Sequence, residues 1–236
     1  MTTDSSTFVL VPGAWHGGWA WHPVAARLRA AGHHAVTFTP PGLDHGDDVS
    51  SVTLADAVDR LTAVIARHTD VVVVSHSWGG IPATAAAYRV PERVSRLVYF
   101  SSVVPRPGVS MNDELPAEGA AYVRATIEAS PDRAVHVLFE QVQQLLMQDE
   151  PEPVQRLAHD LLMPHPGRYF LDPYDGPDPG TGGIPASYLL AADDRALARP
   201  GSEFAARVGV EPVVVPGSHE ALLTHPDELS KALLAL

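Results

Sequence analysis

The chain contains no cysteine, few basic residues and no long apolar run. Without cysteine it has no disulfide, no thiolate metal ligand and no cysteine nucleophile. Its 16 basic residues against 28 acidic ones give a formal charge of −12, which disfavours binding to nucleic acid and to anionic membranes. No apolar stretch approaches the roughly 20 residues of a membrane span. The start of the chain lacks the features of a signal peptide, so we expect a cytoplasmic protein that acts on a small molecule.

Apolar residues are plentiful, and they occur in short segments. They make up 45% of the chain, enough for a sizeable core. Continuously apolar segments alternate with segments of helical periodicity, which is typical of a parallel sheet covered on both faces. We therefore predict an α/β fold with a doubly wound, mainly parallel six-stranded sheet. The expected strands are 7–11, 35–39, 71–74, 94–101, 186–190 and 211–215, and the expected helices beside them are 19–31, 52–67, 78–88, 201–208 and 226–236.

This alternation is interrupted after the fourth predicted strand. Three segments of helical character follow one another at 116–129, 131–147 and 152–163. Residues 163–183 are then so rich in proline and glycine that we predict neither a helix nor a central strand there. We interpret 105–185 as a helical cap inserted into a core formed by 1–104 and 186–236.

A serine lies between a β-branched strand and an alanine-rich helix in residues 70–87. The sequence SHSWG at 75–79 is close to the G-x-S-x-G nucleophile elbow, in which a sharp turn lifts a serine above a parallel sheet. Ser75 stands where that motif has its first glycine. The pattern predicts Ser77 as a nucleophile, the alternative being a serine that only caps the helix. Pro82 predicts a kinked or loosened first turn in that helix.

Partners for this serine follow two later strands. Asp193 and Asp194 come after strand 186–190, and His219 comes after strand 211–215. The carboxyl ends of parallel strands meet at one edge of a sheet, so these side chains can reach the serine. A neutral His219 would accept the serine proton during attack, and a buried carboxylate would hold the imidazole and stabilise its charged form. Position alone leaves both aspartates as candidates for the acid.

Acyl transfer also needs donors for the oxyanion of the tetrahedral intermediate. We predict the backbone N–H groups of Trp78, directly after the nucleophile, and of Ala14, in the loop after the first strand. Trp15 and Glu220 are predicted to line the substrate pocket, and Trp78 is a further candidate for its wall. The alternative for Trp15 is packing in the core.

Three other histidines, His16, His76 and His225, compete with His219 for the role of base. We expect His76 to point aside into packing and His225 to lead into the last helix. No pair of the remaining histidines has metal-ligand spacing, so we predict neither a metal site nor a cofactor. A homodimer is compatible with the sequence, which does not decide the oligomeric state.

These segments resemble the α/β-hydrolase superfamily and, within it, the esterase and hydroxynitrile lyase group. The similar segments are FVLVPGAWHGGWAWHPVAARLRAAGH, VVVVSHSWGG, LVYFSSVVP, YLLAADDR and VVPGSHEALLTHPDEL. The resemblance implies an α/β-hydrolase fold, and the alignment on YLLAADDR favours Asp194 over Asp193. It also implies a set of site residues: a Ser77, Asp194 and His219 triad and an oxyanion hole made by the N–H groups of Ala14 and Trp78.

The chain also departs from the pattern of that group. It has Pro12-Gly13 where the group often has His-Gly. The plant lyases of the group carry a lysine directly after the histidine and a threonine in the oxyanion loop, where this chain has Glu220 and Gly13. A lysine would stabilise departing cyanide and a glutamate would oppose it, so the sequence favours an esterase.

We therefore expect a serine hydrolase that cleaves a small-to-medium, partly apolar carboxylic ester through an acyl-Ser77 intermediate. Two alternatives stay open, because a fold does not decide a function. One is a lyase, cyclase or acyltransferase that works without a cofactor on the same fold. The other is a small-molecule receptor with a vestigial triad.

Overall fold

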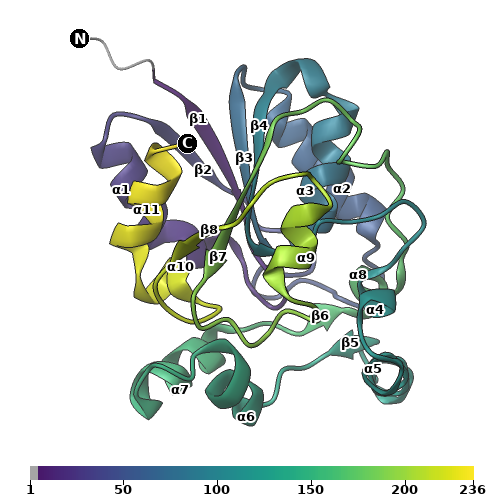
Figure 1. Ribbon diagram of the computed structural model, residues 1–236. Coiled ribbons are helices and arrows are strands. Elements are labelled where there is room, and N and C mark those ends of the chain that lie inside the picture. The colour runs from purple at the N-terminus through teal and green to yellow at the C-terminus, as the bar shows by residue number, and fades with distance from the viewer. Residues whose placement is uncertain (1–4) are drawn as a thin grey trace.

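The computed structural model describes residues 5–236 and is built around one parallel sheet (Figure 1). Six strands lie in the order β2-β1-β3-β4-β7-β8, and every neighbouring pair is parallel. The predicted fold class is thus confirmed. The strands are β1 (Thr7–Val11), β2 (His34–Thr37), β3 (Val71–Ser77), β4 (Val94–Ser102), β7 (Ala186–Ala191) and β8 (Val213–Val215).

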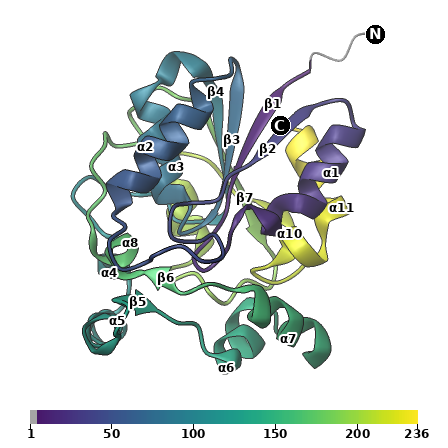
Figure 2. The same cartoon turned by 180° about the vertical axis from the view of Figure 1, so that it is seen from behind.

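Helices cover both faces of the sheet (Figures 1 and 2). One face carries a 3₁₀ turn (Gly18–Trp21), α1 (His22–Ala30), α10 (Ala221–Thr224) and α11 (Pro226–Leu234). The other face carries α2 (Leu54–Ile65), α3 (Gly80–Arg89) and α9 (Gly201–Ala206), with a second 3₁₀ turn (Pro91–Arg93) before β4. No helix in residues 5–236 is both long and apolar enough to cross a bilayer.

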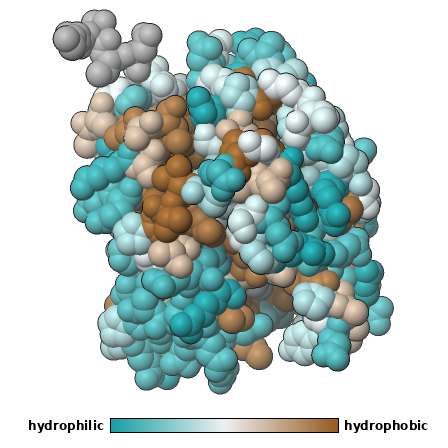
Figure 3. All heavy atoms as spheres, in the orientation of Figure 1, coloured by the Kyte–Doolittle hydropathy of each residue, from teal (hydrophilic) through white to brown (hydrophobic). Residues whose placement is uncertain are grey.

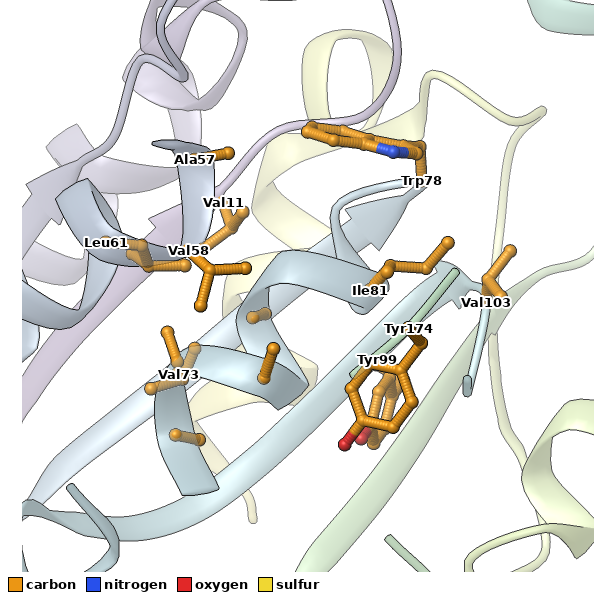
Figure 4. Close-up of a cluster of buried hydrophobic side chains, with 14 of the residues drawn as sticks. Val11, Ala57, Val58, Leu61, Val73, Trp78, Ile81, Tyr99, Val103 and Tyr174 are labelled. Atoms are coloured by element: carbon orange, nitrogen blue, oxygen red, sulfur yellow. The ribbon is translucent and has the colours of Figure 1, made fainter. Parts of the chain in front are cut away.

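Burial on both faces explains why the strands are continuously apolar. Along β1, Phe8 and Leu10 pack under α1 and α11, whereas Val9 and Val11 pack under α2 and α3. At one edge of the sheet, β8 leaves Val213 and Val214 half or more exposed, and Figure 3 shows an apolar patch over this strand. Figure 4 shows the cluster between the sheet and α2 and α3, where Tyr99 and Trp78 are fully buried.

Between β4 and β7 the chain leaves the sheet and forms the insertion, residues 105–185. Figures 1 and 2 show its helices below the carboxyl ends of the strands. Within it, a two-residue antiparallel ladder pairs residues 134–135 with residues 165–166. Its elements are α4 (Met111–Glu114), α5 (Ala117–Ala129), β5 (Ala134–Val135), α6 (Phe139–Gln141), a π-helical turn (Val142–Leu146), α7 (Glu152–Leu161), β6 (His165–Pro166) and α8 (Gly167–Leu171).

Parts of the predicted secondary structure are wrong. The helix predicted over 131–147 is confined to 139–146, because Arg133 has a φ of +56° and the next residues pair with β6. The short helix α8 lies where none was predicted. Pro82 does not loosen α3: it lies in the first turn, where helical N–H groups need no partner, and Ala83 N donates to the Gly79 carbonyl at 3.0 Å.

A buried carboxylate ties the insertion to the core. Glu114, the last residue of α4, accepts two hydrogen bonds from Arg207 at 2.8 and 2.9 Å and one from Arg199 at 2.8 Å. Arg207 also donates to the carbonyl of Val104, directly after β4. Burial would raise the pKa of Glu114, but the hydrogen bonds from Arg207 and Arg199 hold it below its ordinary value of 4.5. The glutamate therefore stays charged and fixes the start of the insertion.

We expect Glu114→Ala to lower the free energy of unfolding by about 3 kcal/mol, because it leaves Arg207 without its buried partner. The folded pKa lies below the unfolded one, so the contribution of the pair is complete above pH 4.5 and is lost as the pH falls through the folded pKa. Urea denaturation at pH 7 and pH 4 measures both effects. Glu118→Ala, on the exposed start of α5, is the control; equal stability of the two variants would contradict the assignment.

Candidate active site

Ser77 ends β3 in a strained turn. Its φ is +52°, a left-handed conformation that costs a residue with a side chain about 1–2 kcal/mol. Two glycines follow in close contact with other strands. A Cβ on Gly79 would lie 2.3 Å from the Pro12 carbonyl oxygen, and one on Gly80 would lie 1.9 Å from the Val103 carbonyl oxygen. The turn therefore needs glycine at both positions and lies against the ends of β1 and β4.

Ser75 is accommodated where the elbow motif has a glycine. Its side chain is buried, and its hydroxyl donates to the Val98 carbonyl at 3.3 Å and lies 3.2 Å from Ser102 Oγ. Ser102 Oγ in turn donates to the carbonyl of Ser77 at 2.9 Å. The additional hydroxyl thus joins β3 to β4 beneath the turn.

The structure brings Asp194, and not Asp193, to His219. The Nδ1 atom of His219 lies 2.8 Å from Oδ2 of Asp194, and both side chains are only 3% exposed. The other carboxylate oxygen of Asp194 accepts hydrogen bonds from the backbone N–H groups of Ala196 and Leu197. Asp193 is exposed to solvent. The acid is therefore held on both of its oxygens.

This pairing sets the charge and the tautomer of the histidine. Burial lowers the pKa of His219, but the charge and hydrogen bond of Asp194, together with the charge of Glu220, raise it above its ordinary value of 6.5. Burial would raise the pKa of Asp194, and the contacts with His219 lower it. Because a carboxylate only accepts, Nδ1 of His219 carries the proton, and Nε2 is the nitrogen free to act as a base.

His76 packs against the ring of His219 and is hydrogen-bonded to its backbone. Its ring is buried against Phe100, and its Nε2 donates to the backbone carbonyl of His219 at 3.0 Å. Burial, with the nearby His219 and His16, holds the pKa of His76 well below its usual range. The expectation that this ring points into packing is confirmed. His76, His219 and Glu220 do bring potential metal-ligand atoms within 4.8 Å of one another. One nitrogen of each histidine is already hydrogen-bonded to a protein oxygen.

The two predicted oxyanion donors come from different loops of the core. Ala14 follows β1 and Trp78 follows the nucleophile. Within residues 5–236, neither N–H donates to a backbone carbonyl, so both are free for another acceptor. Ala14 shares the wall of one pocket with Ser77 and His219.

The loop that carries Ala14 is held by buried histidines and by the insertion. The Ala14 carbonyl lies 2.7 Å from Nδ1 of His16, and the N–H of the same peptide unit, on Trp15, donates to Nδ1 of His165 at 3.1 Å. Trp15 itself has a φ of +66°. Its carbonyl accepts from Met163 N at 2.9 Å, and its indole N–H donates to the Val135 carbonyl at 2.8 Å. No motif in the sequence indicates these roles for His16, His165 and Met163.

A cavity of about 260 Å³ opens above Ser77 and His219. Trp15 lies in its wall, as the sequence predicts. Most of the wall comes from apolar residues of the insertion, among them Met111, Leu115, Tyr122, Val123, Val135, Leu145, Leu146 and Phe170. Three polar side chains, Thr126, His136 and Gln141, complete it. A second hollow, lined by residues 190–201, includes neither Ser77 nor His219.

Two predicted wall residues are placed elsewhere. Glu220 does not line the cavity: its side chain is 2% exposed and its carboxylate faces His16, 3.4 Å from Nε2. The prediction of Glu220 as a pocket residue is therefore wrong. The indole of Trp78 is buried as well, where it stacks on Tyr169 and donates to its carbonyl at 2.9 Å. Only the backbone N–H of Trp78 remains a candidate for binding a ligand.

Comparisons with known proteins identify the family of this chain. A model described as the alpha/beta hydrolase family matches residues 8–232. The chain belongs to this family. It is similar to Methylesterase 18 of Arabidopsis thaliana, with 29% identity over 96% of this chain and 95% of that protein. It is also similar to a carbendazim hydrolyzing esterase of a Nocardioides species, with 41% identity over 47% of this chain and 48% of the other.

Solved structures share the fold of this α/β hydrolase. An extracellular alpha/beta-hydrolase from a Paenibacillus species superposes with a TM-score of 0.89 at 23% identity, over 98% of both chains. A pyrethroid hydrolase from Sphingobium faniae JZ-2 superposes with a TM-score of 0.78 at 21% identity, over 98% of this chain and 97% of that one. The high scores over 98% of this chain show that the fold is common to these proteins.

The elbow glycines give a test of the turn. We expect Gly79→Ala to lower the free energy of unfolding by about 3 kcal/mol, because its Cβ would meet the Pro12 carbonyl. Gly119→Ala is the matched control: it lies inside α5 with nothing closer than 3.8 Å to a new Cβ. That control should gain about 1 kcal/mol from higher helix propensity. Thermal denaturation of both variants measures the difference, and losses of the same size would refute the steric argument.

Proposed function

We propose that this α/β hydrolase cleaves carboxylic esters by acyl transfer to Ser77. The proposal rests on the buried Asp194–His219 pair, because His219 lines the same cavity as Ser77. The relatives named as esterases support ester cleavage. The proposal gives each chemical requirement of acyl transfer a residue: Ser77 as nucleophile, His219 as a base oriented by Asp194, and the N–H groups of Ala14 and Trp78 as donors.

In the first half of the reaction, Ser77 Oγ attacks the ester carbonyl carbon while His219 Nε2 takes the serine proton. The carbonyl oxygen becomes negative and accepts hydrogen bonds from the N–H groups of Ala14 and Trp78. Each of these hydrogen bonds lowers the barrier by about 3 kcal/mol. The bond to the alcohol oxygen then breaks as His219 returns the proton to it. Asp194 stabilises the imidazolium formed between these two steps.

In the second half, water replaces the alcohol. His219 takes a proton from the water as it attacks the acyl-Ser77 carbonyl, and the same N–H donors bind the second oxyanion. Collapse of this intermediate breaks the bond to Ser77 Oγ, which recovers its proton from His219. The products are the carboxylic acid and the alcohol, and the enzyme is regenerated without a cofactor.

The cavity favours a neutral, partly apolar ester of small to medium size. Its volume is about 260 Å³ and its wall is mostly aliphatic and aromatic. The formal charge of −12 on the chain opposes the approach of anionic substrates. The position after His219, occupied by lysine in the plant lyases, holds a glutamate turned away from the cavity, which gives no cation for a departing cyanide.

Labelling tests the nucleophile. A fluorophosphonate probe should modify the folded protein at Ser77, and Ser77→Ala should remove both the label and the hydrolysis of p-nitrophenyl esters. Ser202→Ala, on an exposed position of α9, should leave both unchanged. Mass spectrometry of the peptides locates the adduct. A label at another serine refutes the nucleophile, and ligand binding without turnover favours a receptor.

Paired aspartate variants test the acid. Asp194→Asn should lower kcat by about 10⁴-fold, because the imidazole loses its oriented tautomer and its counter-charge. Asp193→Asn, exposed and one residue away, should change kcat little. The raised pKa of His219 predicts that the wild-type rate falls as the pH decreases through a value above 6.5, where the base becomes protonated. Asp194→Asn should move this limb to lower pH. The opposite ranking of the two variants would assign the role to Asp193.

A further inference from the structure

A second buried acid–histidine pair lies beside the proposed triad and takes no part in the reaction described above. Nε2 of His16 lies 3.4 Å from Oε2 of Glu220, with side-chain exposures of 3% and 2%. That carboxylate oxygen is completely buried and makes no hydrogen bond within residues 5–236. A buried carboxylate without a close partner is costly, so this contact with His16 needs a reason.

The hydrogen bonding of His16 fixes where its protons lie. Nδ1 is 2.7 Å from the Ala14 carbonyl oxygen, which can only accept, so Nδ1 carries a proton. Nε2 and the carboxylate would repel each other through their lone pairs unless a second proton lay between them. At 3.4 Å the two atoms are within ion-pair distance but outside hydrogen-bond geometry, so a proton on either one makes the contact attractive, and Glu220 keeps the ring turned with its Nδ1–H toward Ala14.

The pair connects two parts of the site that come from distant segments. Ala14 follows β1, whereas Glu220 is bonded directly to His219 in the chain. The backbone N–H of Glu220 also donates to the carbonyl of Leu146, a wall residue of the cavity, at 3.2 Å. The line from Ala14 through His16 and Glu220 to His219 thus joins the oxyanion loop to the base.

We propose that Glu220 is a positioning residue that acts through His16 to hold the Ala14 carbonyl, and through it the orientation of Ala14, whose own N–H is the proposed oxyanion donor, relative to His219. This inference rests on the proposed ester hydrolysis. Trp15, next in the chain, has a left-handed φ of +66°, so the loop does not keep its shape by local preference alone. The bond from His16 is one of the contacts that hold it there.

Two near-isosteric variants separate the polar contact from packing. Glu220→Gln keeps a polar group beside Nε2 of His16, while Glu220→Met fills the same space without one. We expect Glu220→Met to lower kcat by about 10- to 100-fold, as is common when a supporting partner is lost, with KM nearly unchanged. Glu220→Gln should stay close to the wild type. Glu228→Met, on an exposed position of α11, is the control.

A transition-state analogue gives a readout that a structural role alone would not move. A trifluoromethyl ketone forms a tetrahedral adduct with the nucleophile and places its oxyanion in the hole. Its inhibition constant should rise in Glu220→Met by the same factor by which kcat/KM falls. His16→Met should show a similar loss, and the double variant should lose little more, because both residues act on the same carbonyl.

The outcomes separate this inference from the proposed function. An active wild type with Glu220→Met equal to it overturns the positioning role alone, as do additive losses in the double variant. A Glu220→Gln variant as impaired as Glu220→Met also overturns it, since the loss would then follow from the charge of Glu220, which also raises the pKa of His219, and not from the polar contact with His16. A wild type that neither hydrolyses esters nor reacts with the probe at Ser77 overturns both.

Discussion

The left-handed turn at Ser77 depends on how closely three strand ends approach one another. Gly79 touches the backbone after β1 and Gly80 touches the backbone after β4, with no room for a Cβ at either. The Val103 N–H donates to the Ser77 carbonyl at 3.0 Å. Local preference opposes this conformation, so packing and hydrogen bonds in the centre of the sheet must supply the free energy that keeps the hydroxyl raised. A strained residue thus lies where packing in the centre of the sheet holds it.

The remainder of the site is shared between the sheet and the insertion. Asp194 and His219 come from loops after β7 and β8, and their geometry is set by the parallel sheet. The loop with Ala14 and Trp15 is different, because three of its hydrogen bonds reach Val135, Met163 and His165 in the insertion. The insertion therefore shapes the oxyanion loop as well as the wall of the cavity.

Features encoded by local sequence were the ones that could be predicted. Strands buried on both faces give continuous apolar runs, and the turn at Ser77 has a recognisable pattern of small residues around a serine. The choice of Asp194 over Asp193 came from the resemblance and not from position. The structure places Asp194 against His219.

Features decided by distant contacts could not be predicted. Residues 131–138 carry apolar side chains that suit a helix, but Arg133 turns the chain and Val135 pairs with His165, 30 residues away. Glu220 follows His219 and is predicted as a pocket residue, yet its partner is His16, in the loop after β1. The spacing of nearby residues predicts neither the partner of a short strand nor the direction in which a buried side chain points.

The hydrogen bonds around Trp15 also bear on how this fold diversifies. An insertion that only roofed the cavity could be exchanged between relatives as a separate module. Here residues between Val135 and His165 form hydrogen bonds with the loop that holds the proposed oxyanion donor. A transplanted insertion would have to bring matching partners for that loop, so substrate range and catalytic geometry are inherited together.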